Sequence, residues 1–244
     1  ASGASSAAGN NSYLQDAYLN ARFLPELQLQ IGKFKEPVGL ERLQSAANLL
    51  FIERGFPTQL VPNRDVGAQL QGDLAGGRLR YEAGVFNGVA DGGSGDLETA
   101  DDEKDFAGRL FGAPFRHTPN QALRGFGFGL AGTVGDQEGG LRSLVTPGQQ
   151  RFFNYRSGLG TAASPNVVAD GEHWRLVPQA SYTWGPVGFF GEYAISHQRI
   201  RRDDGTASFT QVQHEAWQVA AAYVLTGEDP AWKGVTPQRP FRPG

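Results

Sequence analysis

The sequence of 244 residues predicts an all-β chain that folds as a transmembrane antiparallel up-and-down β-barrel. Three observations predict this fold: apolar residues alternate with polar or small ones along many segments, short and long connections alternate between those segments, and glycine is abundant, with 34 residues. Such a barrel needs apolar side chains only on its lipid-facing side. The low mean hydropathy of -0.39 is therefore compatible with a membrane barrel.

The composition excludes several other classes of protein. Cysteine and methionine are absent, which excludes disulfides, thiolate chemistry and cysteine-based zinc sites. The 22 basic and 25 acidic residues give a net charge of -3, so there is no basic excess of the kind that nucleic-acid binding requires. No apolar run approaches the roughly 20 residues of a membrane helix. A chain that begins Ala1-Ser2-Gly3 without methionine is expected to be processed or to be part of a longer protein.

Residues 1–12 are expected to form a flexible tail of small residues, and residues 13–244 the barrel segment. Period-two alternation indicates about nine strands. The expected strands are 13–23, 27–35, 65–74, 78–87, 106–115, 125–134, 174–184, 187–196 and 217–226.

The alternation is clearest in five of these strands. In 65–74, Val66 and Leu70 share one face, and Gln69 and Gln71 share the other. In 78–87 and 174–184, apolar residues occupy one face, and charged residues, glutamine, serine and threonine occupy most of the other. Strands 187–196 and 217–226 alternate as well, with tyrosine and tryptophan on their apolar faces. Each of these strands is therefore expected to face lipid on one side and a polar lumen on the other.

The connections also alternate in length. Tight turns are expected at 24–26, 75–77 and 185–186, and long polar stretches at 36–64, 88–105, 135–172 and 198–213. An outer-membrane barrel has short turns at its periplasmic end and long loops at its extracellular end.

Aromatic residues are expected to form girdles at the two membrane interfaces. Trp174 and Trp184 share a strand face ten residues apart, which is about 33 Å along a strand, or about 23 Å across the membrane at a tilt near 45°. That span is close to the apolar band of such barrels. Trp217 and Tyr223 are the other expected girdle residues, and a tryptophan-containing soluble core is the alternative.

Five short sequences, in this order and spacing, resemble one family. They are Gly32-Lys33-Phe34-Lys35-Glu36-Pro37, Phe51-Ile52-Glu53-Arg54, Arg64-Asp65-Val66-Gly67, Gly185-Pro186-Val187-Gly188 with Gly191-Glu192-Tyr193, and the segment from Tyr223 to Glu228. Together they resemble the phosphate-selective porin O and P family of Gram-negative outer membranes, over most of residues 13–244. The resemblance implies a 16-stranded trimeric barrel whose inward loops form a narrow basic constriction, and it implies that both ends of the barrel lie outside this chain.

A channel for phosphate or polyphosphate needs a water-filled path lined by cations that attract the anion without trapping it. The residues expected to line the anion path are Arg42, Arg54, Arg64, Arg78, Arg80, Arg109, Arg175, Lys33 and Lys35. The alternative is that the strand arginines pair with carboxylates such as Glu82 and Glu192 and only solvate the lumen. Strict alternation places Lys33 and Lys35 on the same strand face as the apolar Leu27, Leu29 and Ile31, which would face lipid. Either a bulge at Gly32 therefore shifts the two lysines to the other face, or both lie above the bilayer.

The segment 36–64 is expected to fold inward as the constriction, with a short helix over 43–51. The alternative is an extracellular loop that packs on a neighbouring subunit. Arg199, Arg201 and Arg202 are expected in a long loop, either as an entry funnel for anions or as a solvated tip. The acidic stretch 91–105 is expected to be solvated or to bind cations that bridge lipopolysaccharide, and it has no ordered metal spacing.

Other motifs carry little weight. Residues 127–132 match GxGxxG, but they lie inside a strand, so we do not expect a dinucleotide site. We expect no enzyme activity, cofactor, metal or nucleic-acid partner, and we expect the partners to be anions, outer-membrane lipid, lipopolysaccharide and two further copies of the chain. The alternatives are a porin without anion preference and a barrel enzyme or adhesion scaffold that acts through its loops.

Overall fold

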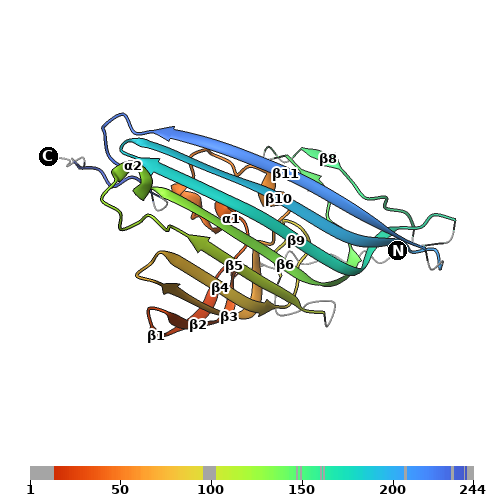
Figure 1. Cartoon of the computed structure of the whole chain (residues 1–244). Helices are drawn as coiled ribbons and strands as arrows, with labels where there is room; N and C mark the ends of the chain where they lie inside the picture. The colour runs from red at the N-terminus through yellow and green to blue at the C-terminus, as the bar shows by residue number, and fades with distance from the viewer. Residues whose placement is uncertain are drawn as a thin grey trace, which may run out of the picture.

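Nine strands form one antiparallel sheet in the computed structural model, which describes residues 14–95, 103–146, 148, 150–159, 161, 163–205, 208–231, 234–238 and 240 (Figure 1). Each strand pairs with the next in this sheet, so that β1 and β11 form its edges. The strands are β1 (Ala17–Leu24), β2 (Leu27–Lys35), β3 (Arg64–Leu74), β4 (Leu79–Phe86), β5 (Asp105–Gly112), β6 (Phe126–Gly140), β9 (Val167–Trp184), β10 (Val187–Arg202) and β11 (Phe209–Tyr223).

The remaining elements are short. Two strands, β7 (Leu144–Val145) and β8 (Arg151–Phe153), pair within the connection between β6 and β9. The helices are α1 (Leu40–Leu43), α2 (Gln121–Arg124) and the 3-10 turns η1 (Ala46–Asn48) and η2 (Phe56–Gln59). In the part of the chain given above, no helix is both long and apolar enough to cross a membrane.

The expected up-and-down antiparallel fold is confirmed. The connections 25–26, 75–78, 113–125 and 185–186 lie at one end of the sheet, and 36–63, 87–104, 141–166 and 203–208 lie at the other. The first end therefore carries three of the shortest connections and the second end the three longest. The two exceptions are 113–125, which is long for the first end, and 203–208, which is short for the second.

Two of the expected long loops are shorter than predicted. Pairing continues from β6 to β9 as far as Gly140 and Val168, and from β10 to β11 as far as Arg201 and Phe209. Beyond the apolar band of the membrane, the sheet has water on both faces. Backbone pairing does not require apolar side chains, so the strands continue there. Their sequence no longer shows the alternation of apolar and polar residues from which strands were predicted.

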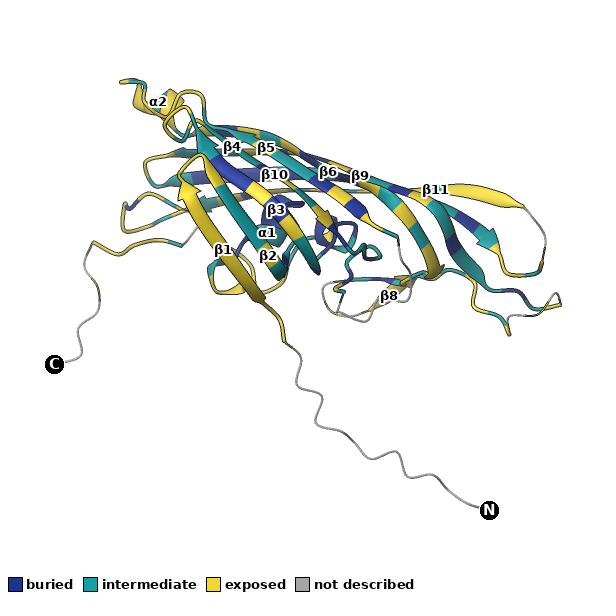
Figure 2. Cartoon of the chain, turned by 90° about the horizontal axis from the view of Figure 1, so that it is seen from below, coloured by how far each residue is buried: buried dark blue, intermediate teal, exposed yellow. Residues whose placement is uncertain are grey.

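The two faces of the sheet differ in burial. Along β9, Leu176 and Trp184 are exposed on the outer, convex face, whereas Arg175, Val177 and Gln179 are buried on the inner, concave face. The segment 36–63 lies on the concave side, where α1 is largely buried (Figure 2). The inner face therefore packs against chain segments, while the outer face is open along its length.

The hydrophobic core fills the space between the concave face and the segment 36–63. Phe34, Phe86 and Val177 come from the sheet, and Val38 and Val61 come from the two ends of the segment. The rings of Phe34 and Phe86 meet edge to face with centroids 5.4 Å apart. This core fixes the ends of the segment where they leave β2 and enter β3.

Gly32 does not form the β-bulge that was one of the two expected explanations for Lys33 and Lys35. The pairing of β2 with β1 and with β3 runs through Gly32 without a shift, so that alternative is wrong. Lys33 consequently stays on the outer face, in line with Ile31. Lys35 is the last residue of β2, where the chain leaves the wall, and its ammonium group reaches the carbonyl oxygen of Gln44 on the inner side at 2.8 Å.

Substitution of Gly32 by alanine is expected to destabilise the β1–β2 pair. Gly32 has a φ of 132°, and a Cβ there would lie 2.2 Å from the carbonyl oxygen of Ala17. We expect a loss of about 1–3 kcal/mol in the free energy of unfolding, measured by thermal unfolding in detergent. Gly108→Ala is the matched control, because its nearest heavy atom would lie 3.9 Å away. Equal unfolding temperatures for the two variants would contradict this account.

Candidate functional site: a basic chamber on the concave face

The segment 36–63 reaches from β2 to the far wall of the sheet. After the buried Val38, Gly39 takes a φ of 81° and turns the chain into α1. The first N–H groups of a helix have no partner within the helix. Here the N–H groups of Leu40 and Glu41 donate to the carboxylate of Glu192 on β10, at 2.5 and 3.1 Å.

The helix expected over 43–51 is wrong. The helical turn is α1 (Leu40–Leu43), and Gln44 and Ser45 then take extended backbone before η1. The Ser45 hydroxyl accepts a hydrogen bond from the N–H of Ala47, which favours a new short turn over continuation of α1.

Between this segment and β1–β4 lies a cavity of about 770 Å³, which we call the basic chamber. Four cations line it, and the strands contribute mainly glutamine and acidic side chains. The residues whose side chains define its character are Lys35, Arg42, Arg54, Arg64, Asp16, Gln30, Gln69, Gln71 and Glu82. Four of the nine predicted anion-path residues therefore meet in one place.

Carbonyl oxygens, rather than carboxylates, hold three of these cations. Arg54 donates to the carbonyls of Glu41 and Gln44, and Lys35 also donates to that of Gln44. Arg42 donates to the carbonyl of Thr58. Among the residues that the structure describes, none of these three cations forms an ion pair. A carbonyl fixes a cation's position but does not cancel its charge.

Arg64 differs from the other three chamber cations. Its guanidinium group forms an ion pair with Asp16, with Nη2 and Oδ2 3.0 Å apart. The net charge of the chamber cations therefore comes chiefly from Lys35, Arg42 and Arg54.

The protonation equilibria of the segment reflect this concentration of positive charge. Burial, and then the neighbouring Arg54 guanidinium, lowers the pKa of Arg42 from its ordinary value to about 10. Burial also lowers the pKa of Arg54. Arg42 still carries a proton at neutral pH, in a place where water no longer fully solvates its charge.

A polar stripe continues from the chamber along the inner face. Arg80 donates to Glu82 at 3.0 Å and to Gln71 at 2.8 Å, and Arg109 donates to Glu82 and to Gln179, each at 3.0 Å. One carboxylate thus lies between two guanidinium groups. Arg80 also pairs with Asp73, with Nη1 and Oδ1 3.5 Å apart, so the two cations and two carboxylates of the stripe balance in charge.

The glycines of residues 127–132 serve packing. The guanidinium carbon of Arg109 lies 4.8 Å from the centre of the Phe111 ring. A Cβ at Gly127 or Gly129 would come within 3 Å of that same ring. The two glycines let Phe111 lie flat on β6, which supports Arg109 through a cation–π contact.

Arg175 is corrected from an anion-path residue to a structural one. Its side chain is 0% exposed, and its nitrogens donate to Asp91 at 2.8 Å, Asp105 at 3.2 Å, Thr133 at 3.0 Å and the carbonyl of Val89 at 2.5 Å. These partners occupy the guanidinium group and leave it no surface for a passing ion. The alternative that strand arginines pair with carboxylates holds at this position.

The same contacts overturn the expectation of a solvated acidic stretch at its two ends. Asp91 accepts hydrogen bonds from Arg175 and, at 2.6 Å, from the hydroxyl of Ser196, and Asp105 is buried. Burial alone would raise the pKa of Asp91, but Arg175 and then His173 hold it well below its ordinary range. Residues 96–102 of that stretch lie outside the described part of the chain.

Two groups of predicted residues lie elsewhere. Arg78 is exposed in the short turn before β4. The loop position expected for Arg199, Arg201 and Arg202 is wrong, because they belong to β10. Ile200 is buried between them on the inner face, so Arg199 and Arg201 face outward, where both pair with Asp170.

The aromatic residues fit the expected girdle only in part. Trp184 and Tyr223 are both exposed, and both align with Val187, so they lie at one level of the sheet. Trp174 stacks on His197, with ring centroids 5.1 Å apart. The strand register places Trp217, 70% exposed, between the levels of Trp174 and Trp184 rather than at either one.

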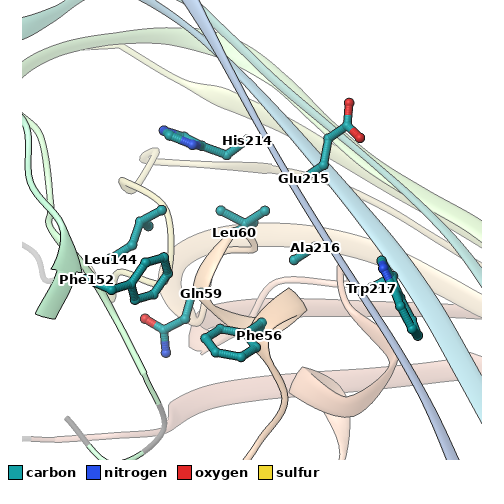
Figure 3. A pocket seen from close by; sticks show the side chains of 9 residues that line it. All are labelled: Phe56, Gln59, Leu60, Leu144, Phe152, His214, Glu215, Ala216 and Trp217. Carbon is teal, nitrogen blue, oxygen red and sulfur yellow. The ribbon is translucent and has the colours of Figure 1, made fainter. Parts of the chain in front are cut away.

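A second cavity of about 500 Å³ beside β11 has a different character. Figure 3 shows His214 and Ala216 on the same side of β11 as Leu60, and Glu215 and Trp217 on the opposite side. The rings of Phe56 and Phe152 meet edge to face in its lining, with centroids 5.7 Å apart. Among the described residues, no arginine or lysine lines this second cavity. Of the two cavities, only the basic chamber is therefore lined by arginine and lysine.

Sequence reasoning did not identify Glu192, Asp91 and Asp105 as anchors. The sequence indicated Glu192 only as a carboxylate with which strand arginines could pair, and the two aspartates lie in a stretch whose composition is typical of a solvated loop. Their partners lie 70 to 152 positions away in the chain. A buried pair of that separation leaves no local pattern.

Glu36 gives the site a testable pH dependence. Its carboxyl group is fully buried, and neither oxygen has a hydrogen-bond partner among the described residues. Burial, and then the nearby Asp105, raises the pKa of Glu36 well above its ordinary value of 4.5. The folded state therefore holds this proton more tightly than the unfolded state.

The protonated Glu36 carboxyl group is consequently expected to contribute to the free energy of unfolding of the wild type. This contribution is complete below pH 4.5. It declines by about 1.4 kcal/mol per pH unit as the pH rises from 4.5 to the raised pKa. Glu36→Gln removes this pH-dependent contribution, because the amide does not ionise. Thermal unfolding of both proteins in detergent from pH 5 to 9 measures the difference. Parallel pH profiles would show that the Glu36 carboxyl group is not a source of the pH dependence.

Comparison with known proteins agrees with the fold. The family model for phosphate-selective porin O and P matches residues 1–243. No curated protein matches the sequence. The match covers nearly the whole chain, including the strands and the segment that builds the chamber. This chain belongs to the phosphate-selective porin O and P family.

Proposed function

We propose that this outer-membrane porin passes small anions, with phosphate and polyphosphate as the preferred solutes, by facilitated diffusion through the basic chamber. Membership of the family implies a channel in a Gram-negative outer membrane. The segment 36–63 is the constriction in this proposal. The homotrimer and the contact with lipopolysaccharide expected from the resemblance belong to the same proposal.

One observation carries the anion preference. Lys35, Arg42 and Arg54 line the basic chamber, and none pairs with a carboxylate in the described chain. A partly desolvated cation that no carboxylate contacts attracts mobile anions from solution. An anion that enters the chamber contacts these cations directly.

The chemistry of Arg42 supports an oxyanion as the solute. Its guanidinium group lines the basic chamber, and Nη2 is fixed on the carbonyl of Thr58. A fixed, planar guanidinium group suits the oxygens of phosphate, because it presents its donors in one plane.

The polar stripe supports release of the anion. Arg80 and Arg109 share Glu82, and Arg80 also pairs with Asp73, so two carboxylates balance the two positive charges in this part of the wall. Conduction requires sites that are favourable enough to enter and weak enough to leave. A basic chamber beside a charge-balanced polar stripe meets both requirements.

A porin without anion preference is the second candidate. Arg175, Arg199 and Arg201 are all paired with aspartates, and the net charge of the chain is -3. In that case the three chamber cations would shape the constriction and have little effect on the sign of the permeating ion.

Reversal potentials in planar bilayers under a salt gradient distinguish the two candidates. We expect the porin, purified as its native assembly, to be anion-selective. We expect Lys35→Gln, Arg42→Gln and Arg54→Gln each to lower the anion-to-cation permeability ratio about fivefold, because one charge at contact distance in water contributes about 1 kcal/mol. Phosphate should also reduce chloride current in the wild type more than in Arg42→Gln.

Arg116→Gln is the matched control, since Arg116 lies on the short connection between β5 and β6, far along the sheet from the chamber. Its permeability ratio is expected to equal that of the wild type. A cation-selective wild type whose reversal potential does not respond to the three chamber substitutions would support the second candidate.

A further inference from the structure

We propose that Glu192 is a positioning residue of the pore: it holds the constriction segment on the far wall and thereby sets the width of the path and the places of Arg42 and Arg54. The inference rests on the proposed function, in which the segment 36–63 is the constriction. Glu192 lies on β10, far from the segment in sequence, and faces the inner side.

The carboxylate of Glu192 is fully used in this contact. Oε2 accepts the N–H of Leu40 at 2.5 Å, and Oε1 accepts the N–H of Glu41 at 3.1 Å and the side-chain amide of Gln218 at 2.7 Å. Glu192 is only 4% exposed. An ionised carboxylate accepts on both oxygens, whereas an amide has one accepting oxygen and one donating nitrogen.

Gln218 of β11 extends the contact. Its amide nitrogen also donates to the carboxylate of Glu41 at 3.1 Å, and that carboxylate accepts the N–H of Gly55 at 2.7 Å. We call Glu192, Gln218, Glu41 and Gly55 the bracket. It ties two separate points of the constriction segment to each other and to two strands of the wall.

The bracket holds the residues that adjoin the chamber arginines. Arg42 directly follows Glu41, and Arg54 directly precedes Gly55. Movement of either held residue therefore moves a cation of the basic chamber. A Cβ at Gly55 would lie 1.7 Å from the Gln218 side-chain oxygen, so glycine is required for this close approach.

The segment has other attachments besides the bracket. At its origin, Val38 and Val61 are buried in the core. On the far wall, Leu40 belongs to a buried apolar cluster with Phe190 of β10 and Ala220 of β11. Loss of the bracket is therefore expected to leave these apolar contacts in place and to loosen the turns between them, which carry the chamber arginines.

The sign of the effect separates positioning from simple electrostatics. If Glu192 acted only as a negative charge near Arg42, its removal would make the pore more anion-selective. If Glu192 positions the segment, its removal lets the arginines leave their places, so the conductance rises and the anion preference falls.

Single-channel recordings of Glu192→Gln in the intact assembly test this. We expect a rise in conductance of about twofold or more, as the constriction widens, together with a lower anion-to-cation permeability ratio. Glu215→Gln is the matched control, because it removes a carboxylate from the outer face of β11 without touching the bracket or the chamber. We expect that variant to keep the conductance and the permeability ratio of the wild type.

Gly55→Ala provides a second variant in case Glu192→Gln does not assemble. It inserts a methyl group between the segment and Gln218 without changing any charge, and we expect the same changes in conductance and selectivity. Because the chain contains no cysteine, a spin label at Ala47→Cys reports the segment alone, and we expect it to become more mobile in both bracket variants.

The outcomes also separate the two proposals. Wild-type conductance, selectivity and label mobility in both bracket variants would overturn the role of Glu192 even in an anion-selective porin. A wild type without anion preference would overturn the proposed function. In that case the rise in conductance and in label mobility would still establish Glu192 as the anchor of the constriction.

Discussion

The arrangement of the inner face depends on the attachment of one segment to two distant walls. Residues 36–63 leave β2 and enter β3 at a buried core. The N–H groups of Leu40 and Glu41, within this segment, donate to the carboxylate of Glu192 on β10. The start of a helix leaves N–H groups without partners, and a buried carboxylate requires donors. Each therefore satisfies the other, and the segment stays across the concave face instead of lying in solvent.

This attachment explains why some arginines are available to solutes and others are not. Arg42 and Arg54 are held by carbonyl oxygens of the segment itself, so their positions are fixed and their charges remain. Arg175 forms ion pairs with Asp91 and Asp105, which neutralise its charge. The pair with Asp91 attaches the connection 87–104 to β9. In the proposed function, the partner of each arginine distinguishes a structural role from a role in transport.

The sequence alone was sufficient for the sheet but not for the site. Alternation predicted the faces of β3 and β9 because lipid admits only apolar side chains on one of them. It failed at the far ends of β6 and β10, where pairing continues without alternation. It also could not separate Arg42 from Arg175, because the distinction depends on Asp91, 84 positions from Arg175 in the chain.

Crystals of the native assembly soaked in bromide offer the most direct test of the central claim, that a segment tied across the barrel presents cations without counter-charges. Anomalous scattering locates bromide independently of any assumption about the path. The account predicts a peak in the basic chamber beside the guanidinium groups of Arg42 and Arg54. An empty chamber, with bromide bound instead at outward residues such as Arg199 and Arg201, would contradict it.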